Sequence, residues 1–232
     1  MRRTMMTVAA MATILAAGPA AAQWNLGGRV DIRVGALDHA SGGSYWTDTG
    51  QYLTGGATDL DDGTVAVDLY RRSAPRSGWM LTVGAFSGET DRAYRDWVLA
   101  SGAPVVHTAR LEEWHLAVAY VVELAGETAP VVPYVGAGIG LYGWELTETG
   151  TFLDFGASPP EPFVGRYRAD GTELGWQALA GLEVRLGLAW SLLAELRYHA
   201  ADAELGSGFT GTVAQDLDLG GTEASVGVAW RW

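Results

Sequence analysis

The chain has 232 residues, no cysteine and a formal net charge of −12 at neutral pH. The lack of cysteine excludes a disulfide framework and a thiolate metal site, and the acidic balance argues against a nucleic-acid partner. The 32 glycines and 10 tryptophans favour an all-β fold with many turns, because glycine weakens a helix by about 1 kcal/mol per residue.

The N-terminal segment has the three parts of a secretory signal peptide. Arg2 and Arg3 give a positive start, residues 5–17 are mostly apolar, and small residues follow up to Ala22. We therefore expect residues 1–22 to be a signal peptide and residues 23–232 to form one exported domain. Beyond the signal peptide, no segment of the sequence reaches the ~20 apolar residues of a spanning helix.

Eight segments after the signal peptide alternate with the period of a β-strand. They cover residues 29–34, 64–69, 79–85, 113–124, 134–141, 176–185, 192–199 and 224–232. One side of every segment is uncharged, and the other side carries charges of both signs, as a barrel interior of paired charges would require. The charged side holds Arg29, Asp31, Arg33, Asp68, Glu113, His115, Glu123, Glu183, Arg185, Glu195, Arg197, Glu223 and Arg231.

The connections between these segments are alternately long and short. The long ones cover roughly residues 37–62, 87–109, 145–172 and 200–221. Such alternation on an even number of strands is typical of a bacterial outer-membrane barrel. A soluble lipocalin-like barrel would carry charge outside, and a β-sandwich would place the aromatics in its core. We predict an eight-stranded, antiparallel, up-and-down transmembrane β-barrel, too narrow for a wide aqueous pore.

Aromatic residues and glycines support this prediction. Two aromatic belts are expected at the membrane interfaces. One belt holds Trp24, Trp79, Trp190 and Trp232 near the short turns, and the other holds Trp114, Trp144, Trp176 and Tyr198 near the long loops. Gly136, Gly138 and Gly140 share the inner side, where they make room for bulky neighbours or permit strong curvature.

Three segments carry a family resemblance. Residues 133–140, PYVGAGIG, resemble the glycine-rich strand of the small outer-membrane β-barrel superfamily, which includes opacity-type surface proteins, "porin family" barrels and OmpX/OmpW-like barrels. Residues 191–198 resemble its penultimate strand, and residues 224–232 resemble its C-terminal assembly signal, although phenylalanine is the commoner last residue there. The resemblance implies the bacterial outer membrane, with lipid, lipopolysaccharide and the assembly machinery as partners. Trp230 and Trp232 are the expected assembly signal.

The last predicted strand must also close the barrel. It is expected to pair with the first strand around Val30 to Val34, because an unpaired strand edge is costly in lipid.

The resemblance also raises the possibility of catalysis, since some small barrels of this membrane modify lipid A. The deacylases among them share a His-x-Ser pair on a late strand. Here His199 is followed by two alanines, and Ser207 lies in a glycine-rich loop with no enforced geometry to it. We predict no catalytic residue, no cofactor and no metal ligand. His115, close to Glu113 on the inner side, is expected to be a polar interior partner.

The predicted loops contain an acidic turn and two histidines. Asp59 to Gly63 is similar to a calcium loop but lacks the glutamate that would complete it, since position 70 is Tyr. A solvated acidic turn is expected, and the binding of divalent cations shared with lipopolysaccharide phosphates is left as a hypothesis. His39 and His107 are predicted to be solvated loop residues.

The second and third long loops also contain apolar residues. These are Tyr94, Trp97, Val98 and Leu99, then Phe152, Phe155, Phe163 and Val164. They either pack with one another over the barrel mouth or display a binding surface, and Trp97 and Phe155 are the candidate contact residues. We predict a non-enzymatic surface barrel with structural, adhesive or host- and envelope-interacting loops. The alternative is a narrow channel for small or apolar solutes.

Overall fold

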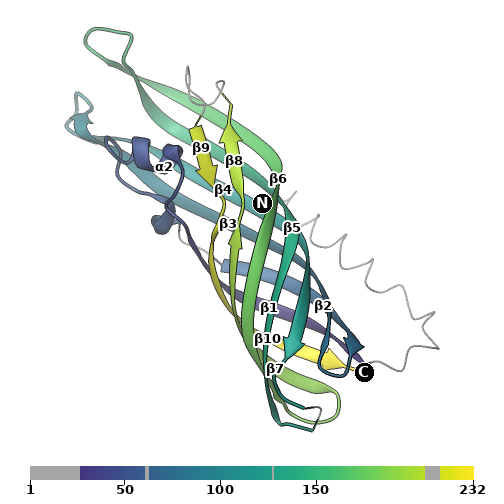
Figure 1. The fold of residues 1–232 in the computed structure, drawn as a ribbon. Helices are drawn as coiled ribbons and strands as arrows, with labels where there is room; N and C mark the ends of the chain where they lie inside the picture. Colours follow the sequence, from purple (N-terminus) through teal and green to yellow (C-terminus); the bar gives the residue numbers. More distant parts are fainter. Residues whose placement is uncertain (1–26, 61–62, 127, 207–214) are drawn as a thin grey trace.

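The computed structural model describes residues 27–60, 63–126, 128–206 and 215–232. Within them, the strands form one closed antiparallel barrel in the order β1-β10-β7-β6-β5-β4-β3-β2 (Figure 1). The prediction of an eight-stranded antiparallel barrel is therefore confirmed. The predicted signal peptide, residues 1–22, and the belt residue Trp24 lie outside the described residues.

The barrel strands differ widely in length. They are β1 (Gly28–His39), β2 (Gly63–Ala74), β3 (Ser77–Val98), β4 (Pro104–Glu123), β5 (Val131–Asp154), β6 (Glu161–Arg185), β7 (Trp190–Ala200) and β10 (Gly221–Arg231). The connection from β1 to β2 contains the short helix α2 (Ser44–Thr49) and the 3-10 helix η1 (Ala57–Asp59). The connection from β7 to β10 forms a small hairpin of β8 (Asp202–Leu205) and β9 (Gln215–Asp218). In the described part of the chain, no helix has the length and apolar character needed to cross a membrane.

The first and last barrel strands close the sheet as the sequence predicted. Val30 lies opposite Trp230, and Val34 lies opposite Val226. This pairing runs from Arg29 to His39 on β1. The barrel thus satisfies its backbone hydrogen bonds between strands and leaves no open edge.

Two of the predicted loops are instead extensions of the barrel sheet. β3 and β4 remain paired as far as Ala93 and Val106, and β5 and β6 remain paired as far as Asp154 and Glu161. Beyond the lipid, the outer side of a strand faces water, so the contrast between an apolar and a charged side weakens there. For this reason the expected loops at residues 87–109 and 145–172 were wrong in conformation, although their positions were right. In Figure 1 these two hairpins rise well above the other strands.

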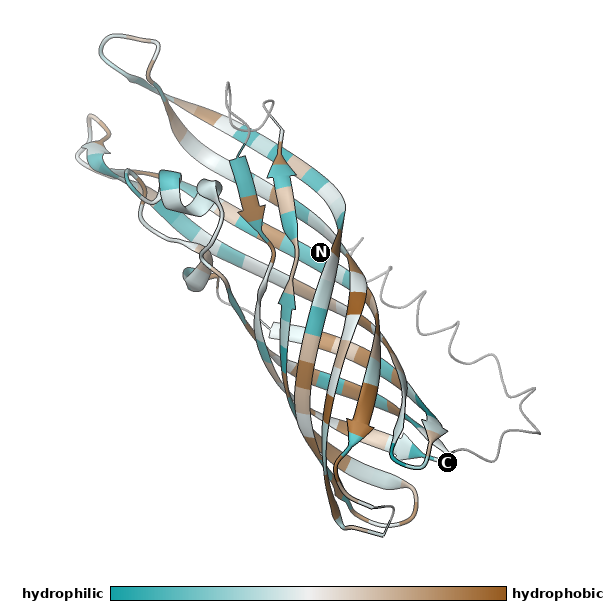
Figure 2. Cartoon of the chain, in the orientation of Figure 1, coloured by the Kyte–Doolittle hydropathy of each residue, from teal (hydrophilic) through white to brown (hydrophobic). Residues whose placement is uncertain are grey.

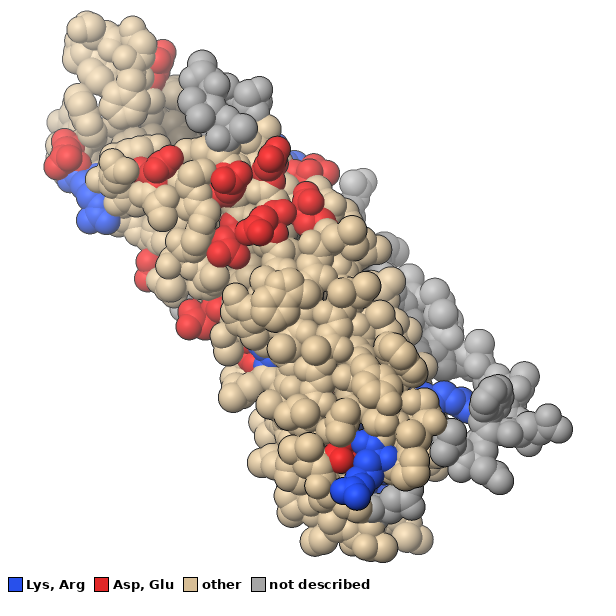
Figure 3. All heavy atoms as spheres, viewed as in Figure 1, with Lys and Arg blue, Asp and Glu red and all other residues tan. Residues whose placement is uncertain are grey.

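The outer surface has a broad apolar band, as expected for lipid contact. Ile32 and Ile139 are 58% and 63% exposed. Figure 2 shows many brown residues in the strands of the short-turn half, and Figure 3 shows mostly tan surface there with few charged side chains. Most of the predicted belt residues are exposed at the two ends of this band: Trp79, Trp190 and Trp232 at one, Trp114, Trp176 and Tyr198 at the other.

The predicted belt position of Trp144 is wrong. Its side chain is 4% exposed and packs in the barrel interior. Alternate residues of a strand face the same side, and Trp144 is four residues after Gly140, so both face the barrel interior. It lies directly opposite Gly171 on β6, where an added Cβ would crowd the indole ring.

Glycines on the inner side make room for large neighbours. Tyr134 lies opposite Gly181, and an added Cβ at Gly181 would overlap the tyrosine ring. In the glycine-rich part of β5, an added Cβ at Gly138 would overlap the backbone carbonyl of Val118. Packing against a neighbouring side chain or strand therefore explains these glycines.

Candidate functional site

The middle of the barrel interior contains a central ionic cluster, formed by Arg33, Asp68, Glu195, Arg197 and Glu223. The Arg33 guanidinium lies 2.6 Å from Asp68 and 3.2 Å from both Glu195 and Glu223. Arg197 lies 2.8 Å from Glu195 and 3.5 Å from Asp68. All five side chains are at most 4% exposed, so the charges are compensated inside the protein and are not solvated.

A second group of predicted interior charges lies nearer the short turns, around Glu183. Arg29 donates to Glu183 at 2.8 Å and to Asp31 at 3.1 Å. Arg185 and Arg231 lie 3.6 and 3.5 Å from the Glu183 carboxylate. The structure therefore brings together in this group charges predicted for the inner side of β1, β6 and β10.

Two other residues predicted for the inner side, Glu113 and His115, have different partners. Glu113 is bonded to His39, with 3.1 Å between the carboxylate and Nε2. His115 instead packs against Tyr142 and His199, with ring centroids 5.7 and 6.4 Å away. The prediction of a solvated His39 is wrong, because β1 continues to this residue and turns its side chain inward, where it is 3% exposed.

Apolar side chains lie on both sides of the central ionic cluster along the barrel axis. Along β7, Leu193 belongs to an apolar cluster on the short-turn side, then Glu195 and Arg197 provide charges. Beyond β7, Ala201 and Ala203 belong to a larger apolar cluster near the long hairpins. That cluster also holds side chains from α2, η1 and the β8–β9 hairpin. Ion pairs and packed apolar groups thus occupy successive levels of the interior.

A separate polar cluster lies between the long hairpins, beyond the apolar band. This distal cluster consists of Tyr45, Thr49, Arg92, His107 and Glu148. Arg92 donates to Thr49 Oγ1 at 2.6 Å and to the Tyr45 hydroxyl at 3.0 Å. The Tyr45 hydroxyl donates to Glu148 at 2.5 Å, and both Arg92 and His107 lie 3.4 Å from the same carboxylate. Arg92 therefore holds α2 against β3 and β5.

The position of His107 corrects another prediction. The residue lies within β4 and is only 2% exposed, so it is not a solvated loop residue. Its ring stacks on Phe152, with 4.6 Å between centroids. The continued strand turns alternate residues inward, and this brings the histidine to the acid.

Burial and neighbouring groups together set the pKa values of Glu148 and Tyr45 in the distal cluster. Burial acts to raise the pKa of Glu148, but the hydrogen bond from Tyr45 and the neighbouring Arg92 and His107 side chains outweigh it, so the pKa lies below the ordinary value of 4.5. Burial and the adjacent Glu148 carboxylate raise the pKa of the Tyr45 hydroxyl. At neutral pH the cluster therefore contains a carboxylate and a neutral phenol that donates to it.

A cavity of about 570 Å³ opens beside the distal cluster. Its floor includes Tyr45, His107 and Glu148, and its rim includes the two contact residues predicted from the sequence, Trp97 and Phe155. Trp97 lies at the end of β3, and its ring centroid is 6.1 Å from that of Phe155. The structure brings these two residues together, although they come from different hairpins.

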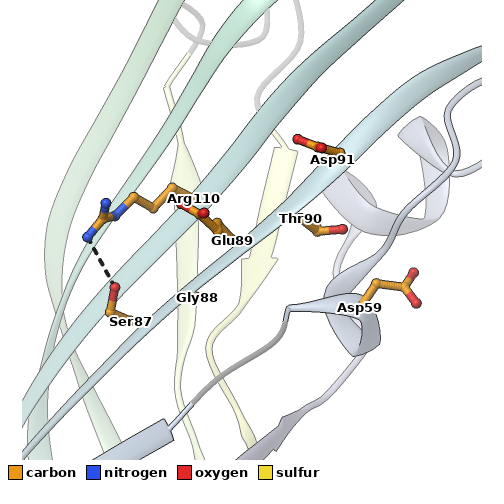
Figure 4. A pocket seen from close by; sticks show the side chains of 7 residues that line it. All are labelled: Asp59, Ser87, Gly88, Glu89, Thr90, Asp91 and Arg110. Carbon is orange, nitrogen blue, oxygen red and sulfur yellow. Dashed lines mark hydrogen bonds between the residues drawn. The ribbon is translucent and has the colours of Figure 1, made fainter. Parts of the chain in front are cut away.

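A second hollow of about 470 Å³ lies beside β3 and η1 (Figure 4). Two of its charged side chains already have partners: Arg110 contacts Glu112 at 2.6 Å, and Asp91 accepts from Thr108 at 2.7 Å. Asp59, from the sequence similar to a calcium loop, accepts from the Gly56 amide. The neighbouring residues 61 and 62 lie outside the described part of the chain. Among the described residues, no group of three or more acidic or histidine side chains is arranged to hold a metal ion.

The residues considered for lipid A chemistry do not form a described catalytic pair. The His199 ring is buried and stacks on Tyr142, with 5.3 Å between centroids. Ser207 lies outside the described residues. The ring contacts of His199 are with Tyr142 and with His115, whose ring centroid is 6.4 Å away.

Comparisons with known proteins agree with the barrel architecture. Residues 7–231 match the family described as outer membrane protein beta-barrel domain. The fold is similar to that of the outer membrane protein OprG of Pseudomonas aeruginosa, with 13% identity and a TM-score of 0.54 over 88% of this chain and 96% of that one. It is also similar to a major outer membrane protein of Thermus thermophilus, with 13% identity and a TM-score of 0.50 over 90% and 100% of the two chains. No curated protein matches the sequence.

Proposed function

Because the chain belongs to the outer membrane protein beta-barrel domain family, we propose that it is a non-enzymatic surface protein whose barrel anchors an extracellular binding region. The protein lies in the bacterial outer membrane, with the apolar band in the lipid. In barrels of this class, the long connections are on the cell surface and the short turns face the periplasm. The β3–β4 and β5–β6 hairpins and the cavity between them are then accessible from outside the cell.

The observation that carries this proposal is the contrast between a filled interior and an open distal end. The central ionic cluster is at most 4% exposed and lies between packed apolar groups. An ion that crossed the barrel would have to displace these paired charges, whose separation in a low-dielectric interior costs several kcal/mol. The cavity beside Trp97 and Phe155, by contrast, is open.

Single-channel recording in planar bilayers tests whether the barrel serves only as a membrane anchor or forms a narrow channel. We expect no discrete openings from purified protein whose heat-modifiable mobility on gels shows that it is folded. Reproducible openings of constant conductance would support a solute channel and contradict the proposed role.

The role of Trp230 and Trp232 in assembly stays a prediction. Both side chains are about half exposed, at 49% and 50%, and their ring centroids lie 5.4 Å apart at the periplasmic edge of the apolar band. Exposed rings at this position are available to lipid and to the assembly machinery. A Trp232→Ala variant that reaches the outer membrane at the normal level in heat-modifiable form would contradict this role.

A further inference from the structure

The walls of the distal cavity are mainly aromatic. Tyr52 stacks on Tyr94 with 6.4 Å between ring centroids, and Tyr94 lies 6.2 Å from Phe155, which in turn lies 6.1 Å from Trp97. On the other side, Phe152 contacts the rings of Phe163 and Tyr167 at 5.9 and 5.0 Å. These rings come from three separate connections and hairpins and line the same space. Their faces are electron-rich and attract cations within about 6 Å of a ring centroid.

The charged groups of the cavity have the sign that favours a cation. Asp96 and Glu148 line the cavity, and no arginine is among the described lining residues. The sequence contains no lysine. Glu148 is paired with Arg92, whereas Asp96 is exposed at the rim and has no ion pair with a described residue. Figure 3 also shows Asp and Glu side chains gathered over this half of the visible surface.

From these features we propose that the cavity binds an organic cation with a quaternary ammonium group, of the trimethylammonium type found in choline. The rings would surround the methyl groups, and Asp96 would supply the opposite charge at the rim. A quaternary ammonium has no N–H to donate, so its recognition needs aromatic faces and a nearby carboxylate, without a matching acceptor for each hydrogen. The cavity volume of about 570 Å³ is within the range of small-molecule sites. This inference rests on the proposed binding role of the distal end.

Other charge types fit the same cavity less well. An anion would face Asp96 without a lining arginine or lysine to compensate it. A neutral apolar molecule would use the rings but would gain nothing from the carboxylate. Two ligands of the same shape but different charge therefore distinguish a cation site from a site for neutral apolar molecules.

The test compares choline with 3,3-dimethyl-1-butanol, which replaces the ammonium nitrogen by carbon and keeps the shape. Binding is measured by isothermal titration calorimetry on the full chain in phosphatidylglycerol vesicles, which contain no choline headgroup. We expect choline to bind about tenfold or more tightly than its neutral analogue, the range of a desolvated cation–π site. Equal binding of both compounds, or no binding of choline, would overturn the proposal.

Three variants locate the site. Trp97→Ala should weaken choline binding about tenfold, and Trp97→Phe should recover part of the loss because it restores a ring. Asp96→Asn should weaken binding of choline but leave the neutral analogue unaffected. Matched controls are Val98→Ala, next to Trp97 and 64% exposed, and Glu161→Gln, an exposed acid on the β6 hairpin, neither of which lines the cavity. If the controls lower the affinity as much as the site variants do, the cavity is not the site.

The outcome is independent of the test of the proposed function. Folding of each variant is checked by heat-modifiable mobility, so a loss of binding is not mistaken for a loss of the barrel. Absence of choline binding together with silent bilayers would contradict the cation site alone. Channel openings would contradict the proposed anchoring role whatever choline does.

Discussion

Two of the buried arginines, Arg33 and Arg92, lie in separate polar clusters whose surroundings differ. Arg33 lies in the membrane-embedded interior with three carboxylates within 3.2 Å. Arg92 lies between the extracellular hairpins with one carboxylate, a phenol and a threonine hydroxyl around it. Both side chains are at most 1% exposed.

This difference indicates what each cluster does. The central ionic cluster joins β1, β2, β7 and β10, which are part of the closed barrel, and it has packed groups on either side. The distal cluster joins α2 to β3 and β5, and one side of it borders an open cavity. Charge in the first cluster fixes the barrel strands, whereas charge in the second positions the wall of a binding site.

The largest effect is expected from Arg33→Met. The substitution leaves Asp68, Glu195 and Glu223 without their shared partner, and removal of one member of a buried ionic group costs about 3–5 kcal/mol. The free energy of unfolding, measured by urea titration of protein refolded into vesicles, should fall by that amount. Arg110→Met is the control, since Arg110 is 40% exposed and the loss of an exposed ion pair costs at most about 1 kcal/mol. Equal effects of the two substitutions would show that burial of the charge has no special importance.

Arg92→Met should have a smaller and local effect. It removes the hydrogen bond to Thr49 that holds α2 and leaves Glu148 with a buried negative charge, at a cost of about 1–3 kcal/mol. Hydrogen exchange of residues 44–49 should become faster, while the urea midpoint of the barrel stays nearly unchanged. A global destabilisation as large as that of Arg33→Met would contradict the distinction between the two clusters.

The sequence predicted the membrane-embedded half well because lipid and a packed interior impose opposite demands on alternate residues. Arg33 and Ile32 illustrate this, since neighbouring positions are 1% and 58% exposed. The closure of β1 on β10 followed from the same pattern.

The distal half was predicted less well because that contrast is lost where the strands enter water. Arg92 and Glu148 lie in stretches whose sequence predicts loops, so their inward side chains do not follow from it, and the same stretches predict a solvated His107. The even-numbered residues Thr90, Arg92 and Tyr94 do continue the inner side of β3. This continued alternation is the feature of the sequence that indicates a longer strand. Trp97 and Phe155 were found by composition alone, since apolar side chains are conspicuous in an acidic loop. The contact between them depends on the pairing of distant strands.

The smallest effect is expected from lowering the pH, which protonates Glu148 in the distal cluster. The pKa of Glu148 is lowered in the folded protein from its ordinary value of 4.5, so its stabilising effect is complete above that pH and is lost as the pH falls through the folded value. Hydrogen exchange of the upper β3–β4 hairpin should therefore be constant from neutral pH to about 5 after correction for the intrinsic rate, and should accelerate below 4.5. Other carboxylates titrate in the same range, so the quantity to measure is the difference between the unsubstituted protein and Glu148→Gln. That difference should shrink as the pH falls below 4.5, because the protonated acid and the amide then have the same charge, whereas the exposed control Glu161→Gln should leave the pH profile unchanged. A difference that is constant with pH would mean that the geometry of the hydrogen bonds, and not the charge on Glu148, holds the distal cluster together.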